Sequence, residues 1–250
     1  MPGRRGRHPR APRRRSRPAR PRGVVLHRCA LPDGCLARTP TGGTARGDVR
    51  PGPRHPDRDV ILATPRLELR EMTVDDLPAL RRILQDPQAM RAYEGAFSEE
   101  ETRQWLDRQV QRYHDDGHGL WAVVHRDSGE MIGQCGITRQ RIDLDEVVEV
   151  GYLFERAHWH RGYAVEAASA CRDWAFATLP IDELYAKVRA TNVASMNVAI
   201  RLGMTVRRTF TTHYRGVDMP HLAFAVDLAS WRRGAVAPSR ADRSRGDVES

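Results

Sequence analysis

Hydrophobic positions along the chain follow two spacings, one typical of strands and one typical of helices. Leucines at every second position predict a first strand within residues 61–72. A helical spacing begins after Thr73, with Leu77, Leu80, Ile83 and Leu84 on one face. Ser98 and Glu101 have the spacing of a capping box and predict a second helix, whose buried positions are Trp105, Leu106, Val110 and Tyr113.

The middle and the end of the chain predict further strands and helices. Asp127-Ser128-Gly129 lies between two β-type runs and predicts a hairpin. Gly203 is placed to end the last of the helices. The strands are expected over residues 120–126, 130–139, 146–154, 184–189, 205–212 and 221–228, and the helices over 162–178 and 193–202.

Residues 1–58 differ from the rest of the chain in composition and charge. They hold sixteen arginines and three aspartates, whereas the remaining chain holds 25 basic and 29 acidic residues. Such a segment buries too little apolar surface to offset its ordering entropy, so we expect disorder. It is either a translation start assigned too far upstream or an arginine-rich arm for RNA or anionic lipid. A folded domain is expected over residues 59–230, followed by a disordered polar tail over 231–250.

Composition excludes several classes of protein. No run of about 18 apolar residues is present, and no apolar segment follows Arg13-Arg14-Arg15, so we expect a cytoplasmic protein without a membrane partner. The mildly acidic folded part argues against nucleic-acid binding except through the N-terminal arm. No C-x-x-C pair or histidine cluster is present, so no metal site is expected. Lys187 is the only lysine, which indicates a GC-rich, bacterial genome.

A strand, a basic turn and a helix start follow one another within residues 147–168. Unpaired amides and the positive end of the dipole at a helix N-terminus favour a bound anion. Gly162 lets the backbone approach that anion closely. The turn is neither G-x-G-x-x-G nor G-x-x-x-x-G-K-S/T, which argues against a dinucleotide fold and a nucleoside-triphosphate loop.

This segment resembles motif A of the GNAT-type N-acetyltransferases, whose pattern is Q/R-x-x-G-x-G/A. It is most similar to the branch that acetylates the N-terminal alanine or serine of ribosomal proteins, where E-I-G-Y precedes P-x-x-W-G-x-G-Y-A-T-E-A. Here Glu149-Val150-Gly151-Tyr152 precedes residues 157–167. Ala157, His160 and Val165 replace the usual proline, first glycine and threonine.

Two more segments resemble the same family. Residues 190–204 are similar to its N-x-x-S-x-x-V and L-G-F segment, and residues 64–70 to the opening T-x-R-L-x-L-R of that branch. The resemblance implies an α/β (α+β) fold with a mixed, mostly antiparallel sheet and helices on both faces. In that fold, the strands expected at 146–154 and 184–189 are parallel and splay apart around acetyl-CoA.

The resemblance also implies which residues bind the coenzyme. The turn would hold the pyrophosphate through its backbone amides, and the open strand edge would pair with the pantetheine amides. His160 would either add a cationic contact or crowd the anion. The coenzyme-binding positions implied are Val150, Tyr152, His160, Arg161, Gly162, Tyr163, Ala164, Val165, Asn192 and Asn197.

Acetyl transfer to an amine needs a base, because amines near neutral pH are largely protonated. Glu149 is the first candidate, since the branch carries a glutamate there; the alternative is an exposed residue or a structural ion pair. Glu146 is the second candidate, and Glu166 fits a structural role at a helix start. The usual tyrosine acid position is Ala199 here, so Ser195 would protonate the thiolate unless it only caps the helix.

The sequence therefore predicts a GNAT acetyltransferase that moves acetyl directly from acetyl-CoA to a primary amine, at a protein N-terminus or on a small molecule. Acetyl-CoA is the co-substrate, and the protein is expected to be a monomer or homodimer. Two alternatives remain. One is a non-catalytic acyl-CoA-binding module, and the other is an RNA- or ribosome-associated protein that uses its arginine-rich arm.

Overall fold

The computed structural model describes residues 59–93, 95–214 and 216–236. All of them lie in the second of two units that the chain forms, Val49–Ser250. The predicted disorder of residues 1–58 lies outside the described residues, as does residue 237 onward of the predicted C-terminal tail. No described helix is both long enough and apolar enough to cross a membrane.

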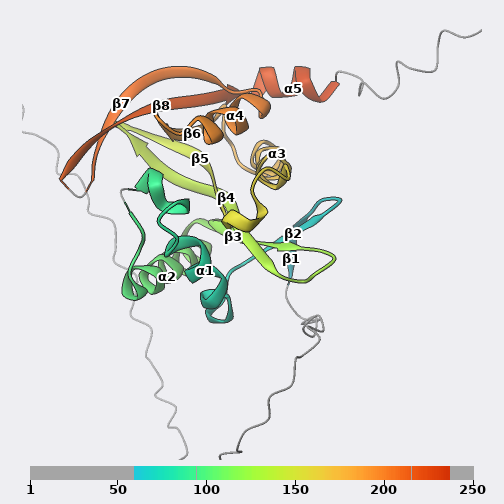
Figure 1. Cartoon of the computed structure of the whole chain (residues 1–250). Helices are drawn as coiled ribbons and strands as arrows, with labels where there is room; N and C mark the ends of the chain where they lie inside the picture. Colours follow the sequence, from blue (N-terminus) through green and yellow to red (C-terminus); the bar gives the residue numbers. More distant parts are fainter. Residues whose placement is uncertain (1–58, 94, 215, 237–250) are drawn as a thin grey trace, which may run out of the picture. The chain divides into compact units, whose positions relative to one another are not determined.

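An eight-stranded sheet forms the centre of this unit, in the order β1-β2-β3-β4-β5-β6-β8-β7 (Figure 1). Every neighbouring pair is antiparallel except β5 and β6, which are parallel. The predicted fold class, a mixed and mostly antiparallel sheet with one parallel pair, is confirmed. The strands are β1 (Val60–Ala63), β2 (Leu67–Arg70), β3 (Leu120–His125), β4 (Met131–Ile142), β5 (Asp145–Phe154), β6 (Glu183–Arg189), β7 (Thr205–Tyr214) and β8 (Val217–Asp227).

Helices cover both faces of the sheet (Figure 1). One apolar core lies between the sheet and α1 and α2, and a second lies between the sheet and α3 and α4. The predicted capping box of Ser98 and Glu101 opens α2. The helices are α1 (Leu77–Leu84), α2 (Glu99–Asp116), α3 (Tyr163–Thr178), α4 (Val193–Arg201) and α5 (Leu228–Val236), with short 3-10 turns η1 (Val74–Asp76), η2 (Ala89–Tyr93) and η3 (Arg156–His158).

The alternation of side chains along β5 and β6 determines which residues reach each core. Val150 and Phe154 of β5 pack into the core beneath α3, together with Leu184, Ala186 and Val188 of β6. Because successive side chains of a strand point to opposite faces, Glu149 of β5 and Lys187 of β6 lie on the other face. These two polar residues therefore share the face that α1 and α2 cover only in part.

Three elements differ from the sequence prediction. The expected single strand over 61–72 is a hairpin, in which β1 and β2 pair antiparallel around Thr64-Pro65-Arg66. Strand β8 begins at Val217 rather than at 221, with Pro220 inside it. Helix α5 continues to Val236, past the expected end of order at Trp231, whose ring stacks on Phe176.

Candidate active site

The parallel strands β5 and β6 part soon after they meet. Glu149 and Tyr185 are the only register partners between them in the described chain, whereas β4 and β5 stay paired from Gly133–Phe154 to Ile142–Asp145. Beyond Glu149, no described strand covers the edge of β5 that faces β6. The predicted splayed pair is thus present, and it leaves an open strand edge where the coenzyme is expected.

Glu149 lies at the point where the strands part, and its carboxylate replaces a missing sheet contact. Its Oε1 accepts a hydrogen bond of 3.0 Å from the backbone N–H of Lys187 on β6. Its Oε2 lies 3.8 Å from Lys187 Nζ, which donates to Gln140 Oε1 at 3.0 Å. The Glu149 side chain is 12% exposed. A nearly buried carboxylate therefore faces the opening between the strands.

Burial raises the pKa of Glu149. Loss of water raises the pKa of this carboxyl above its usual 4.5, although Lys187 and Arg112 oppose the shift by favouring the charged form. A base works best when its pKa lies near the working pH, so a raised pKa suits a carboxylate that accepts a proton from an amine.

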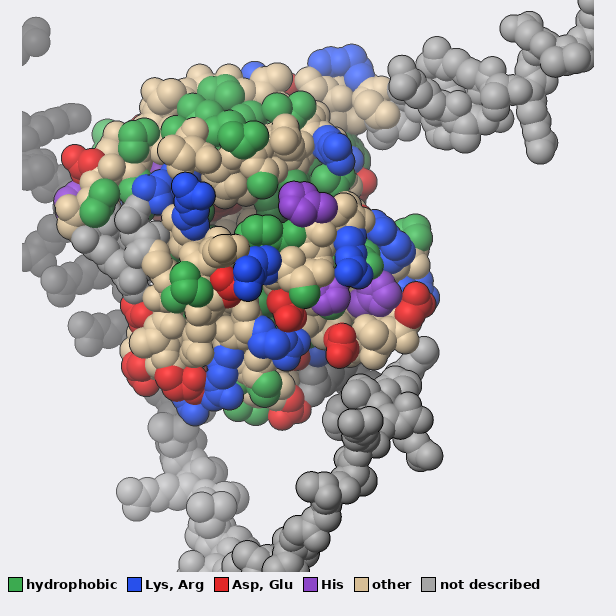
Figure 2. All heavy atoms as spheres, viewed as in Figure 1, with side chains coloured by type: hydrophobic (Ala, Val, Ile, Leu, Met, Phe, Trp, Pro, Cys, Tyr) green, Lys and Arg blue, Asp and Glu red, His purple; other side chains and the backbone are tan. Residues whose placement is uncertain are grey.

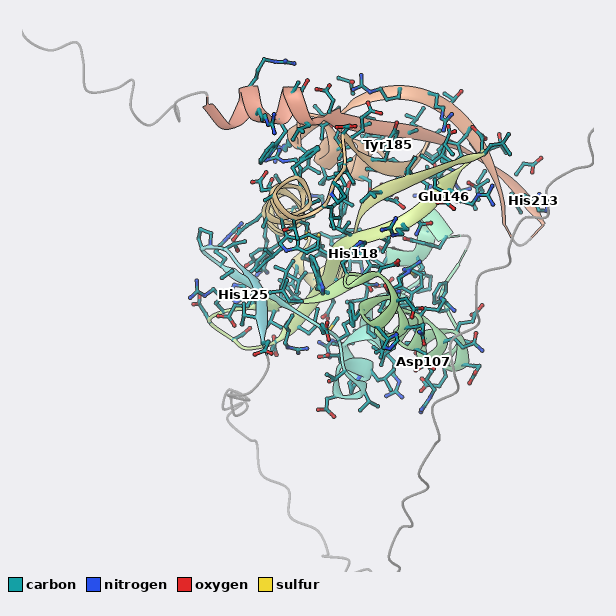
Figure 3. All side chains as sticks on the ribbon, turned by 180° about the vertical axis from the view of Figure 1, so that it is seen from behind. Asp107, His118, His125, Glu146, Tyr185 and His213 are labelled. Atoms are coloured by element: carbon teal, nitrogen blue, oxygen red, sulfur yellow. The ribbon has the colours of Figure 1, made fainter. Side chains whose placement is uncertain are left out.

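Glu146, the second candidate base, lies elsewhere. It pairs with Arg141 near the end of the β4–β5 hairpin and is exposed. It is three positions before Glu149 on the same strand, so its side chain leaves the opposite face of β5. Figure 3 labels Glu146 together with Tyr185, the register partner of Glu149. The two glutamates do not share a site.

The turn before α3 presents its backbone amides. His160 and Gly162 both have left-handed backbone conformations, with φ of 60° and 80°. The first helical hydrogen bond runs from Glu166 N to the Gly162 carbonyl, which leaves the amides of Tyr163, Ala164 and Val165 at the open end of α3. A Cβ at Gly162 would meet only Arg66 Nη2, at 3.5 Å. This turn can therefore receive an anion.

Arg66 contacts both the turn before α3 and the first turn of that helix. Its guanidinium donates to the Arg161 carbonyl at 3.0 Å and lies 4.5 Å from the centre of the Tyr163 ring. The same side chain pairs with Glu166 of α3 at 2.6 Å, and Thr64 donates to Glu166 Oε1 at 2.6 Å. The β1–β2 hairpin is thereby fastened to the helix start, and the structural role predicted for Glu166 is confirmed.

Glu166→Gln should cost stability in a pH-dependent way. Hydrogen bonds from Thr64 and Arg66 outweigh the opposing effect of desolvation and lower the pKa of Glu166 below 4.5. A lowered carboxyl pKa stabilises the fold above the unfolded-state value, and this stabilisation is lost as the pH falls through the folded-state value. Denaturant unfolding should show a loss of about 1 kcal/mol at neutral pH and a much smaller loss at a pH below the lowered pKa of Glu166. An equal loss at both pH values would contradict the ionic contribution.

His160→Gly should stabilise the domain. His160 is one of two non-glycine residues with positive φ in the described chain, the other being Asp143. Glycine adopts this conformation without the Cβ clash, so the free energy of unfolding should rise by about 0.5–1 kcal/mol. Thermal melts of His160→Gly and of Asp143→Gly would test this. Acetyl-CoA affinity unchanged in His160→Gly would mean that the backbone holds the anion, and a large loss would mean that the imidazole contacts it.

Basic side chains surround the turn. The Tyr163 ring lies 5.5 Å from the His125 ring and 6.2 Å from the His158 ring, centre to centre. Burial is the largest cause of a lowered pKa of His158, and Arg161 contributes. Figure 2 shows Lys, Arg and His side chains across the middle of the face seen in Figure 1, with Asp and Glu side chains among them. The basic members of this set favour the approach of an anion.

Helix α4 lies beside the opening between β5 and β6. The Tyr152 hydroxyl, on β5, donates to the Ser195 carbonyl at 2.9 Å, and burial raises the pKa of this tyrosine. Asn192 is the N-cap of α4 and accepts from Ser195 N at 3.2 Å. Within the described residues the Ser195 hydroxyl makes no hydrogen bond, and Asn197 is exposed. Asn192 thus has a capping role, while the Ser195 hydroxyl is available to another partner.

Sequence reasoning missed three residues of this site. Thr64 and Arg66 fasten the turn, and their signal was the T-x-R-L-x-L-R segment, which was used only to support the resemblance. Lys187 lies beside the candidate base, and its only signal was that no other lysine exists in the chain. Nothing local in the sequence places it 3.8 Å from a glutamate 38 positions earlier.

Comparison with known proteins finds acetyltransferases among those similar to this chain. Residues 66–205 match the acetyltransferase (GNAT) domain family. The uncharacterized protein YkkB of Bacillus subtilis is 38% identical over 149 residues, which cover 59% of this chain and 87% of YkkB. An acetyltransferase structure from Agrobacterium tumefaciens is 33% identical, with a TM-score of 0.57 over 66% of this chain and 92% of its own. The structure of the ribosomal L7/L12 alpha-N-protein acetyltransferase RimL in complex with coenzyme A shares the fold. It is 18% identical, with a TM-score of 0.56 over 69% of this chain and 99% of its own.

Proposed function

Because the chain belongs to the GNAT family of N-acetyltransferases, we propose that it moves acetyl from acetyl-CoA directly to a primary amine. The acceptor is a protein N-terminus or a small-molecule amine. The observation that carries this proposal is the position of Glu149, a nearly buried carboxylate with a raised pKa at the point where β5 and β6 part.

Glu149 is the general base of the proposed reaction. An ammonium group has no lone pair, so the acceptor must lose a proton before its nitrogen attacks a thioester carbon. Glu149 takes that proton, directly or through a water molecule that it orders. Lys187 and Arg112 oppose the rise in the pKa of Glu149, because both favour its charged form.

The turn before α3 binds the coenzyme in this proposal. Acetyl-CoA supplies the activated acetyl group, and its pyrophosphate lies on the amides of Tyr163, Ala164 and Val165. The open edge of β5 beyond Glu149 then pairs with the amides of the pantetheine arm. Holding the two reactants in line contributes roughly 7–11 kcal/mol of the barrier reduction in such reactions.

Ser195 stabilises the departing thiolate. Its hydroxyl has no hydrogen-bond partner within the described residues, and it lies in the first turn of α4, one wall of the opening. The tyrosine that many relatives use cannot act here, because Ala199 occupies that position and is fully buried. Solvent can also protonate a thiolate of moderate basicity, so Ser195 contributes less than Glu149.

The experiment is a thiol-release screen of an amine panel with acetyl-CoA, in which peptides with varied N-termini and small-molecule amines are compared. Free thiol that appears only with some amines supports the proposal. Tight acetyl-CoA binding without turnover on any amine would instead indicate a non-catalytic module. Binding to RNA that weakens steeply with salt, without thiol release, would indicate the function of the N-terminal arm.

A further inference from the structure

Lys187 is the only lysine among the 250 residues of the chain. It lies on β6, two residues after Tyr185, which Figure 3 labels, and its side chain is on the same face as Tyr185. This face is opposite to α3 and α4 and carries the Glu149 side chain. The Lys187 side chain is 24% exposed, so it is sheltered from bulk solvent but not sealed off.

The amine of Lys187 lies within reach of the proposed base. Its Nζ is 3.8 Å from Glu149 Oε2, the atom proposed to remove a proton from the acceptor. One further contact, of 3.0 Å to Gln140 Oε1, orients the ammonium group. The backbone N–H of Lys187 also binds Glu149 Oε1, so the base and this lysine keep their relative position.

We propose that Lys187 is an acceptor in its own right, so that the enzyme acetylates its own Lys187 Nζ. This inference rests on the proposed function, because it uses the same acetyl donor and the same base. In the transfer, Glu149 takes a proton from the Lys187 ammonium, and the freed nitrogen lone pair attacks the thioester carbon. The N–C bond forms and the C–S bond breaks. The second proton that the nitrogen loses reaches the departing thiolate through the Ser195 hydroxyl or solvent.

Acetylation would change the base that carries it out. An acetylated lysine has no charge, so Glu149 would lose the nearest cation that stabilises its ionised form. Its pKa would rise further, and less of the base would be ionised at a given pH. The modification would therefore inhibit transfer to external amines. This inhibition would increase as acetyl-CoA accumulates without an acceptor.

The test is mass spectrometry of the full chain after incubation with isotope-labelled acetyl-CoA and no external amine. Acetylation blocks tryptic cleavage at Lys187, so the labelled product is the uncleaved peptide of residues 173–189. We expect this peptide to carry one labelled acetyl group. The fraction modified per unit time should not change when the protein is diluted, because the lysine and the base belong to one molecule.

Three matched samples separate self-acetylation from spontaneous chemistry. Lys187→Arg keeps the charge and offers no lysine amine. Trypsin then cleaves after residue 187, and no labelled acetyl group should appear within residues 173–189. Glu149→Gln keeps the side-chain shape and should slow labelling by about 10²-fold or more. Unfolded protein exposes the same lysine without the site, so labelling of unfolded protein as fast as that of folded protein would overturn the proposal.

Failure of this inference is distinguishable from failure of the proposed function. Calorimetry with acetyl-CoA and thiol release with the best external amine are measured on the same preparation. Binding and turnover with Lys187 left unmodified would overturn self-acetylation alone. Absence of acetyl-CoA binding would overturn both. If the modification inhibits transfer, Lys187→Gln, which lacks the charge as acetyl-lysine does, should shift the acid limb of the pH–rate profile to higher pH relative to Lys187→Arg.

Discussion

Glu149→Gln should lower turnover by about 10²- to 10⁴-fold, which is the usual contribution of general base catalysis. The amide has the shape of the carboxylate, and its oxygen can still accept from the backbone N–H of Lys187. The fold and the affinity for acetyl-CoA should therefore persist. Steady-state kinetics with a responsive amine, together with calorimetry, measure both quantities.

The pH dependence of the same variant gives an independent readout. Because burial raises the pKa of Glu149, turnover of the parent should fall as the pH decreases through a value above 4.5. The glutamine variant should lack this limb, and its residual rate should climb with pH as more of the acceptor amine is free. Glu146→Gln is the matched control, since Glu146 is on the same strand but leaves its opposite face. Parent-like turnover of Glu149→Gln would place the base elsewhere.

Gly162→Val should weaken acetyl-CoA binding at least tenfold, or by about 1.4 kcal/mol. Space is not the obstacle, because a Cβ would meet only the movable end of Arg66 at 3.5 Å. The obstacle is φ of 80°, which a β-branched residue rarely adopts. The turn should relax to another conformation and move the amides of Tyr163, Ala164 and Val165 away from the anion.

The control for this variant is Gly203→Val. Gly203 has the same φ of 80° and open space around a built Cβ, but it follows α4 rather than preceding α3. Both substitutions should lower the melting temperature by similar amounts, because both force valine into the left-handed region. Only Gly162→Val should change the affinity for acetyl-CoA, measured by calorimetry. Equal affinities in the two folded variants would remove this turn from the coenzyme site.

Local signals in the sequence were sufficient for most of the fold. The capping box of Ser98 and Glu101 and the turn at Asp127-Ser128-Gly129 are complete within a few residues, so they needed no tertiary information. The misjudged boundaries have physical reasons. Apolar residues lie on both sides of Pro65, at Ile61 and Leu62 and again at Leu67 and Leu69, so a single strand was expected where the chain makes a tight turn. Pro220 argues against a strand, although β8 accommodates it opposite Thr211.

The C-terminal helix could not be read from its composition. Residues 228–236 have a weak apolar stripe, which Arg232, Arg233 and Gly234 interrupt. What orders α5 is a set of contacts from distant segments: Trp231 stacks on Phe176, and its indole N–H donates to Asp173 at 2.7 Å. Asp227 adds a cap by accepting from Ser230 N at 2.7 Å.

The site was predictable in its parts but not in its electrostatics. Sequence resemblance placed Glu149 on a strand and Gly162 at a helix start, and the structure puts both there. It could not show that Lys187 lies beside Glu149, nor that Arg66 binds the carbonyl of Arg161. These contacts join segments 38 and 95 positions apart, and they depend on strand register rather than on local pattern.

The splayed strands β5 and β6 also link the concentration of the acetyl donor to the stability of the protein. Beyond Glu149, the facing edges of β5 and β6 have backbone groups without a strand partner in the described chain, and such groups cost free energy when they are buried. A coenzyme that pairs with them relieves this cost only in the folded state. Binding to the folded chain alone raises the free energy of unfolding with ligand concentration. Abundance of the protein in a cell would then follow the level of its co-substrate, since unfolded chains are the ones that proteases remove.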